Sequence, residues 1–117
     1  MPTDLQNASE RRIFERFSAR FPAKFKDTRE NYGTDVFLRD ASAQGIRIVT
    51  KERFFWGDQI AVDVELPDGG LPMTLSGFVV WVKSVNLSLW ETGIQFNEVD
   101  LFRMQRLFKL AESIEQP

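Results

Sequence analysis

The 117-residue chain contains neither cysteine nor histidine. Without cysteine it can form no disulfide and no thiolate metal site, and without histidine it lacks the commonest metal ligand and the usual general base. No apolar run approaches the roughly 20 residues that a membrane-spanning helix needs. The first ten residues are polar and hold no apolar signal core. The sequence therefore predicts a cytoplasmic protein with no metal site and no membrane insertion.

Motifs for catalysis are also absent from the sequence. Ser42 has no histidine or neighbouring lysine that could activate it, and the carboxylates are scattered along the chain. No Walker loop, calcium-binding loop or zinc-protease motif occurs. We therefore expect no catalytic residues and no cofactor, and a binding function rather than an enzyme.

The composition is that of one soluble domain with an aromatic core. Hydrophobic residues make up 43% of the chain and include 11 Phe and 3 Trp. The net charge of −2 is uneven, because residues 10–29 carry seven basic and three acidic side chains and the remainder is acidic. A local basic zone suits a small anion better than RNA or single-stranded DNA, whose partners are usually basic throughout. A solvated basic stretch without a ligand is the alternative.

Alternating apolar residues predict short strands through most of the chain. Residues 1–10 resemble a flexible tail, and 11–20 are ambiguous between an extended arm and a helical turn. The clearest alternation has Ile60, Val62, Val64 and Leu66 on one face. Turn residues such as Asn31-Tyr32-Gly33 separate the strands. The predicted strands are 22–27, 34–39, 46–50, 60–66, 73–83 and 90–96.

The period changes to that of a helix over residues 98–114. Asn97 is the expected cap, with Glu98 and Asp100 in the first turn. The expected apolar stripe comprises Val99, Phe102, Leu107, Phe108, Ala111 and Ile114. The sequence thus predicts an all-β domain with a C-terminal helix, in which six antiparallel strands over 21–97 close into a barrel that leaves no exposed edge.

Two polar constellations are candidates for binding. Arg12 and Arg16 share one side of the backbone in either a helix or a strand, and Arg11 adds a third guanidinium. Arginine grips phosphate oxygens bidentately and can also donate to guanine or stack on it. Spaced arginine pairs are common, however, and Arg16 and Arg20 repeat the same spacing.

The second constellation is the expected turn from Asp40 to Gly45. The Asp40 carboxylate can accept hydrogen bonds from the Watson–Crick edge of guanine, and the Ser42 hydroxyl can donate to a phosphate. Gly45 permits positive φ and a close approach of the backbone to a ligand. The alternative is an ordinary turn in which Asp40 and Ser42 bond to their own backbone.

Trp81 is a candidate stacking surface. The alternation of the predicted strand puts it on the same face as Val79 and Lys83, which favours a place in the core. The alternative is a platform for a purine at the barrel mouth.

These residues, taken in order, resemble the PilZ domain family of bacterial receptors for cyclic di-GMP. The segment Glu10–Arg16 is similar to the arginine arm of that family, and Asp40–Ile46 is similar to its Asp/Asn-x-Ser-x-x-Gly signature. Gly77–Trp81, Gly93–Phe96 and the C-terminal helix resemble its later elements.

The resemblance implies a domain over residues 11–114 that binds cyclic di-GMP. It implies that Arg12 and Arg16 bind phosphate and guanine, and that Trp81 borders the ligand. Asp40, Ser42 and Gly45 would line the other guanine site. Arg11 would accompany an intercalated pair of ligands, and Arg47 would add a phosphate contact. The mobile arm would close over the ligand and signal to a separate protein. The alternative is an adaptor of the same fold that binds no ligand.

Overall fold

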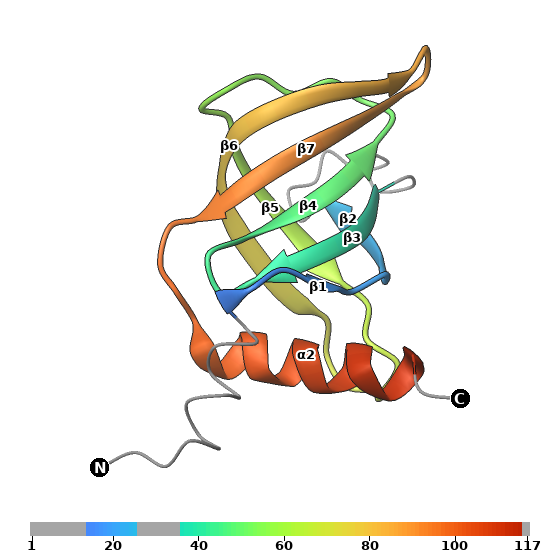
Figure 1. The fold of residues 1–117 in the computed structure, drawn as a ribbon, viewed down its shortest axis with the longest axis vertical. Helices are drawn as coiled ribbons and strands as arrows, with labels where there is room; N and C mark the ends of the chain where they lie inside the picture. Colours follow the sequence, from blue (N-terminus) through green and yellow to red (C-terminus); the bar gives the residue numbers. More distant parts are fainter. Residues whose placement is uncertain (1–13, 26–35, 116–117) are drawn as a thin grey trace.

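The computed structural model describes residues 14–25 and 36–115, which form one antiparallel sheet and a C-terminal helix (Figure 1). The expected tail, Arg11, Arg12 and the turn at Asn31-Tyr32-Gly33 lie outside the described residues. The elements are β1 (Phe17–Ser18), β2 (Pro22–Phe25), β3 (Val36–Ser42), β4 (Gly45–Thr50), β5 (Gln59–Val64), β6 (Met73–Asn86), β7 (Leu89–Phe96) and α2 (Leu101–Glu115).

The sheet has seven strands within the described residues, so the expected number of six is wrong. The extra strand arises because the chain from Phe17 to Phe25 follows β3 in two short pieces. Phe17 of β1 pairs with Ala41, and Pro22 of β2 pairs with Phe37. Part of the expected arm therefore already belongs to the sheet.

The strand order is β1-β3-β2-β5-β6-β7-β4, and β4 also pairs with β3. The pairings that start at β3 thus return to β3 through β4, and β1 pairs with β3 beside this circuit. The sheet curls around an apolar interior (Figure 1). The alternation predicted for residues 60–66 is confirmed, since Ile60, Val62 and Val64 of β5 and the following Leu66 are all buried. Burial of each such side chain contributes about 1.5–3 kcal/mol.

Helix α2 lies across one end of the curled sheet, and the β6–β7 hairpin extends from the other end (Figure 1). Asn97 is not the helix cap, because the backbone N–H of Arg103 donates to Asp100 Oδ1 at 3.0 Å. The buried stripe consists of Met104, Leu107 and Ala111, with Phe108 half-buried. No helix within the described residues is both long and apolar enough to cross a membrane.

Two residues of the predicted apolar stripe lie at the surface instead. Val99 precedes the helix and is exposed, and Phe102 is 87% exposed. Phe102 lies two positions before Met104, which is about 200° around the helix axis. The prediction failed there because the helix begins three residues later than expected and its stripe has a different phase.

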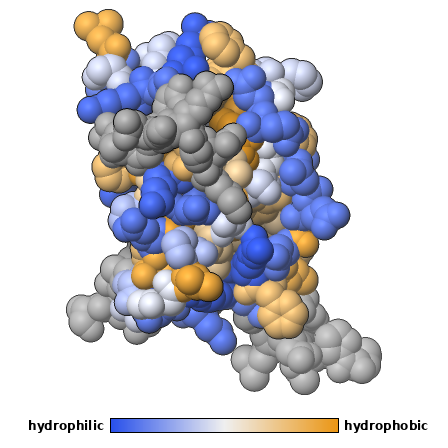
Figure 2. All heavy atoms as spheres, turned by 180° about the vertical axis from the view of Figure 1, so that it is seen from behind, coloured by the Kyte–Doolittle hydropathy of each residue, from blue (hydrophilic) through white to orange (hydrophobic). Residues whose placement is uncertain are grey.

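Several large apolar side chains are exposed, among them the chain neighbours Phe55 and Trp56. On the face opposite to that of Figure 1, hydrophilic side chains predominate and hydrophobic ones lie singly among them (Figure 2). Trp56 is 76% exposed in the loop between β4 and β5, and Leu87 is fully exposed at the turn of the β6–β7 hairpin. The chain reverses there from β6, which ends at Asn86, into β7, which begins at Leu89.

Candidate functional site

The β3–β4 hairpin carries the second polar constellation, but its turn is shorter than the sequence predicts. Strand β3 continues to Ser42, which pairs with Gly45, so only Ala43 and Gln44 form the turn. Ser42 Oγ accepts a hydrogen bond from the backbone N–H of Gln44 at 3.2 Å, as an ordinary turn serine does. Asp40 is therefore a strand residue, and its carboxylate makes no such local bond.

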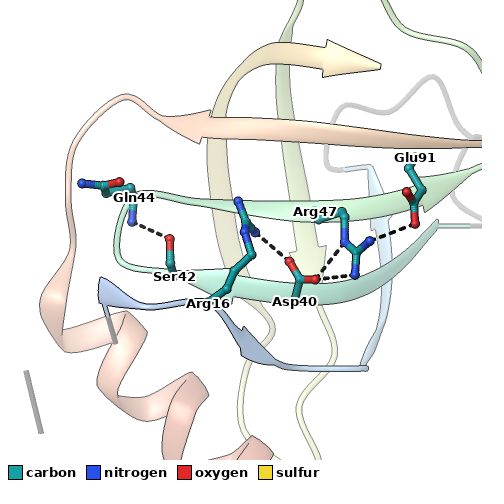
Figure 3. Close-up of polar contacts among 6 residues, drawn as sticks. All are labelled: Arg16, Asp40, Ser42, Gln44, Arg47 and Glu91. Carbon is teal, nitrogen blue, oxygen red and sulfur yellow. Dashed lines mark hydrogen bonds and ion pairs between the residues drawn. The ribbon is translucent and has the colours of Figure 1, made fainter. Parts of the chain in front are cut away.

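Asp40 lies at the centre of a chain of four charged side chains (Figure 3). Its Oδ1 is 2.6 Å from Arg16 Nη1. Its Oδ2 accepts from Arg47 Nε at 2.8 Å and lies 2.5 Å from Arg47 Nη2. Arg47 Nη1 in turn donates to Glu91 Oε2 at 3.0 Å. We call Arg16, Asp40, Arg47 and Glu91 the sheet cluster.

The register of the strands explains why these side chains meet. Asp40 on β3 is directly opposite Arg47 on β4, and Arg47 is opposite Gly93 on β7. Directly opposite residues of antiparallel strands project from the same face. Because Ile46 and Ile48 point into the core, Arg47 between them must point outward. The sheet cluster thus lies on the outer face of the sheet.

The two ends of the sheet cluster differ in exposure. The side chains of Asp40 and Glu91 are 13% and 18% exposed, and that of Arg47 is 32% exposed. Arg16 is 47% exposed and immediately precedes the two-residue strand β1. Arg47 is therefore held on both sides by carboxylates, whereas Arg16 has one such partner among the described residues.

Trp81 lies on the same outer face of the sheet as the sheet cluster, in one row of paired residues. It is opposite Gly93, so the row runs Asp40, Arg47, Gly93 and Trp81 across β3, β4, β7 and β6. Three strand spacings separate its ends, about 14 Å between backbones. A β-bulge between Val79 and Trp81 shifts the register of β6, which puts Trp81 outward while Val79 stays fully buried. The predicted core position of Trp81 is therefore wrong.

Gly93 provides the space in which the Trp81 indole lies. A Cβ atom at Gly93 would be 2.2 Å from Trp81 Nε1, so no other residue fits beneath the ring as it is placed. The indole thus lies over β7 next to the Arg47 position, and Trp81 remains 37% exposed. A flat, half-exposed aromatic ring can take a base on its free face.

The fold requires a glycine at position 45 for a reason that the sequence did not reveal. Its φ is not positive, since the glycines with positive φ within the described residues are Gly57 and Gly69. A Cβ atom at Gly45 would be 2.2 Å from the carbonyl oxygen of Ile94 on β7. The close backbone approach expected at Gly45 is thus made by a neighbouring strand.

An open cavity of about 310 Å³ lies beside Arg16, between the chain before β2 and helix α2. Phe17 and Phe108 pack edge to face across this junction, with their ring centroids 5.1 Å apart. The cavity is lined by Glu15, Arg16, Phe17, Ser18, Phe108, Ala111 and Glu112. It adjoins the sheet cluster but does not include Asp40 or Trp81.

The structure brings together Arg16, Asp40, Arg47 and Trp81 of the predicted site residues. Ser42 and Gly45 lie at the adjacent turn, both buried, and Arg11 and Arg12 lie outside the described residues. Two residues of β7, Glu91 and Gly93, were not among the predicted site residues. The alternation of the last predicted strand puts both on one face, but only the pairing of β7 with β4 and β6 shows what they touch.

Comparison with known proteins identifies a family and solved structures of similar fold. The family model described as PilZ domain matches residues 10–113. The solved structure of the Bacillus subtilis Inhibitor of motility (MotI/DgrA) has a similar fold, with a TM-score of 0.61 and 15% sequence identity. The similarity covers 86% of this chain and 49% of that one, so this chain spans about half the length of the neighbour. Comparison with curated proteins gives no match.

Proposed function

Because the chain belongs to the PilZ domain family, we propose that it is a receptor for cyclic di-GMP that signals to a separate partner protein. The family and the fold neighbour are regulatory or adaptor proteins rather than enzymes. The observation that supports the proposal most directly is the outer row in which Asp40, Arg47 and Trp81 follow one another, with Arg16 bound to Asp40. In this proposal the curled sheet is the barrel of the family.

Each group of the row matches one part of the ligand. The Asp40 carboxylate is an acceptor for the N1–H and N2–H₂ donors of guanine, which adenine does not offer in that arrangement. Arg16, together with Arg12 and Arg11, supplies guanidinium donors for the phosphates. The Trp81 indole offers a stacking face for the base. Ser42 and Gly45 act through the hairpin turn, which fixes the direction of β3.

At Arg16 and Phe17 the structure differs from a free arm that swings onto the sheet. Arg16 already lies on the sheet, paired with Asp40, and Phe17 is already paired with Ala41. In the proposed mechanism the ligand therefore meets a segment that already lies on the sheet at Arg16 and Phe17. Arg47 contacts carboxylates through Nε, Nη1 and Nη2, and it thereby orients Asp40. The predicted contact of Arg47 with phosphate would require one of these bonds to change.

The proposed output is control of motility, pili, biofilm or polysaccharide through the partner. The fold neighbour is named as an inhibitor of motility, which supports the first of these processes. The cytoplasmic location and the binding of one ligand or an intercalated pair stay predictions.

Calorimetric titration with cyclic di-GMP tests the proposal, with cyclic di-AMP and GTP as controls. We expect micromolar affinity, which corresponds to about −8 kcal/mol, and no comparable binding of the controls. Arg12→Ala should abolish binding and leave the melting temperature near that of the wild type, whereas Arg20→Ala should bind normally. Equal affinity for cyclic di-AMP, or no heat at millimolar ligand, contradicts the proposal.

A ligand-independent adaptor is the second candidate function. The contacts within the sheet cluster favour it, since Asp40 and Arg47 have charged partners among the protein's own side chains. The same titration separates the two candidates, because an adaptor of this kind gives no heat with cyclic di-GMP.

A further inference from the structure

The two oxygens of Asp40 have different partners. Oδ2 accepts from two nitrogens of Arg47, which is fixed in the middle of the sheet between Asp40 and Glu91. Oδ1 accepts from Arg16, which comes from the segment before β1 and is the most exposed member of the sheet cluster. In Figure 3, Arg16 reaches Asp40 from the side opposite to Arg47. The outer side of Asp40 is thus occupied by a side chain of the protein itself.

The group that occupies Oδ1 resembles the Watson–Crick edge of guanine. A guanidinium is planar and presents adjacent N–H donors on one carbon. Guanine presents the same pattern, since N1–H and N2–H₂ are both attached to C2. A carboxylate oxygen that accepts from Arg16 can therefore accept from guanine in the same direction. Adenine offers an acceptor at the corresponding ring nitrogen and cannot replace the guanidinium.

We propose that Arg16 is a specificity-determining residue that competes with the ligand for Asp40. A guanine base displaces Arg16 from Oδ1, and an anionic phosphate of the same ligand then pairs with the released guanidinium. This inference rests on the proposed function and deepens it. A neutral guanine compound satisfies Asp40 but leaves Arg16 without a partner, and an anion without guanine leaves Asp40 without its outer donor. The site thus selects ligands that carry both groups.

Arg16 is the member of the sheet cluster that can exchange. Release of Arg47 would remove the charged partner of Glu91 and one partner of Asp40 at once, and both carboxylates are largely shielded from water. Release of Arg16 breaks one contact of a half-exposed side chain, which costs far less. The backbone need not move, since Phe17 stays paired with Ala41 and packed against Phe108. The exchange therefore needs only a rotation of the Arg16 side chain.

The test compares cyclic di-GMP with guanosine, which has the base but no phosphate, by NMR titration of the full chain. The wild type, Arg16→Ala and Arg20→Ala are titrated with each compound. We expect Arg16→Ala to weaken cyclic di-GMP binding at least tenfold, because a charge-assisted bond to phosphate is lost. The same variant should bind guanosine about two- to fivefold more tightly, the range set by one exposed ion pair. Arg20→Ala is the matched control, an exposed arginine four residues further along, and should change neither affinity.

Opposite changes for the two ligands are the signature of competition, because a purely structural loss would weaken both. Arg16→Gln, which keeps a polar side chain but removes the charge, should show the same signs if Arg16→Ala is poorly folded. Unchanged or weaker guanosine binding in both variants overturns the inference, even if the wild type binds cyclic di-GMP. Tighter guanosine binding in a protein that ignores cyclic di-GMP supports the competition and refutes the proposed function.

Discussion

Within the described residues, two groups of arginine–carboxylate contacts join distant parts of the sequence, and they differ in what surrounds the carboxylate. In the sheet cluster, Asp40 lies between two guanidinium groups and its side chain is 13% exposed. At the other group, which we call the helix pair, Asp68 before β6 meets Arg106 of α2 at 2.7 Å. Asp68 also accepts from the backbone N–H of Gly70 at 3.0 Å, and its side chain is 35% exposed.

The difference sets how easily each carboxylate can exchange its donors. The Asp68 carboxylate is satisfied by its own turn and by one helix residue, so it fixes the loop between β5 and β6 against α2. Asp40 receives nothing from its own turn, and one of its oxygens depends on a half-exposed arginine. Carboxylates whose donors come from a neighbouring segment can change partners more easily than those bonded to their own backbone.

Asp40→Asn should have the largest effect. The amide keeps an oxygen but loses the charge that holds Arg16 and Arg47, so we expect a loss of about 1–3 kcal/mol in the free energy of unfolding. Affinity for cyclic di-GMP should fall at least tenfold in a calorimetric titration. Asp63→Asn on β5 is the matched control, because its oxygen can still accept from Thr74 Oγ1. Equal affinities for wild type and Asp40→Asn would remove Asp40 from the site.

Glu91→Gln should have an intermediate effect, since Glu91 acts on Asp40 only through Arg47. Loss of the 3.0 Å contact should reduce the free energy of unfolding by about 1 kcal/mol. Affinity for cyclic di-GMP should fall less than in Asp40→Asn, because Arg47 keeps its bonds to Oδ2. Chemical denaturation and calorimetry measure the two quantities. Glu65→Gln, at an exposed position, is the control, and a larger loss of affinity than in Asp40→Asn would show that Glu91 contacts the ligand itself.

Asp68→Asn should have the smallest effect, and one that depends on pH. The Arg106 guanidinium and the Gly70 N–H lower the pKa of Asp68 below its usual 3.8. The ionised pair therefore stabilises the fold above the unfolded-state pKa, and this contribution disappears as the pH falls through the folded-state value. Melting curves should show a slightly less stable variant at pH 7, and the difference should shrink as the pH falls below 3.8. A difference that persists in acid would mean that the charge of Asp68 is not its source. Ligand affinity should not change.

Much of the fold follows from local patterns in the sequence. Period-2 alternation located the strands after residue 59, and the change of period located the C-terminal helix. The residue at which the helix begins depends on which of Asn97 and Asp100 reaches a free backbone N–H, and both are good caps. Local propensity cannot choose between them, which is why the phase of the buried stripe was predicted wrongly.

The contacts within the sheet cluster could not be predicted from residue types. The types of Arg16 and Asp40 suggested anion and guanine binding, and the resemblance added Arg47, but neither indicated that these side chains bind one another. Glu91 joins them across 44 residues of sequence, and such a contact depends on strand register. Strict alternation favoured the core over a stacking surface for Trp81, and the bulge at Val80 breaks that alternation.

That single additional residue in β6 decides on which face of the sheet Trp81 lies. Trp81 is two positions after Val79, so regular alternation would put the indole on the apolar side with Val79; the bulge puts it on the outer face instead, 37% exposed. The same residue types in a regular strand of the same spacing would put the indole on the packed side. In the proposed site the bulge therefore matters as much as the tryptophan itself.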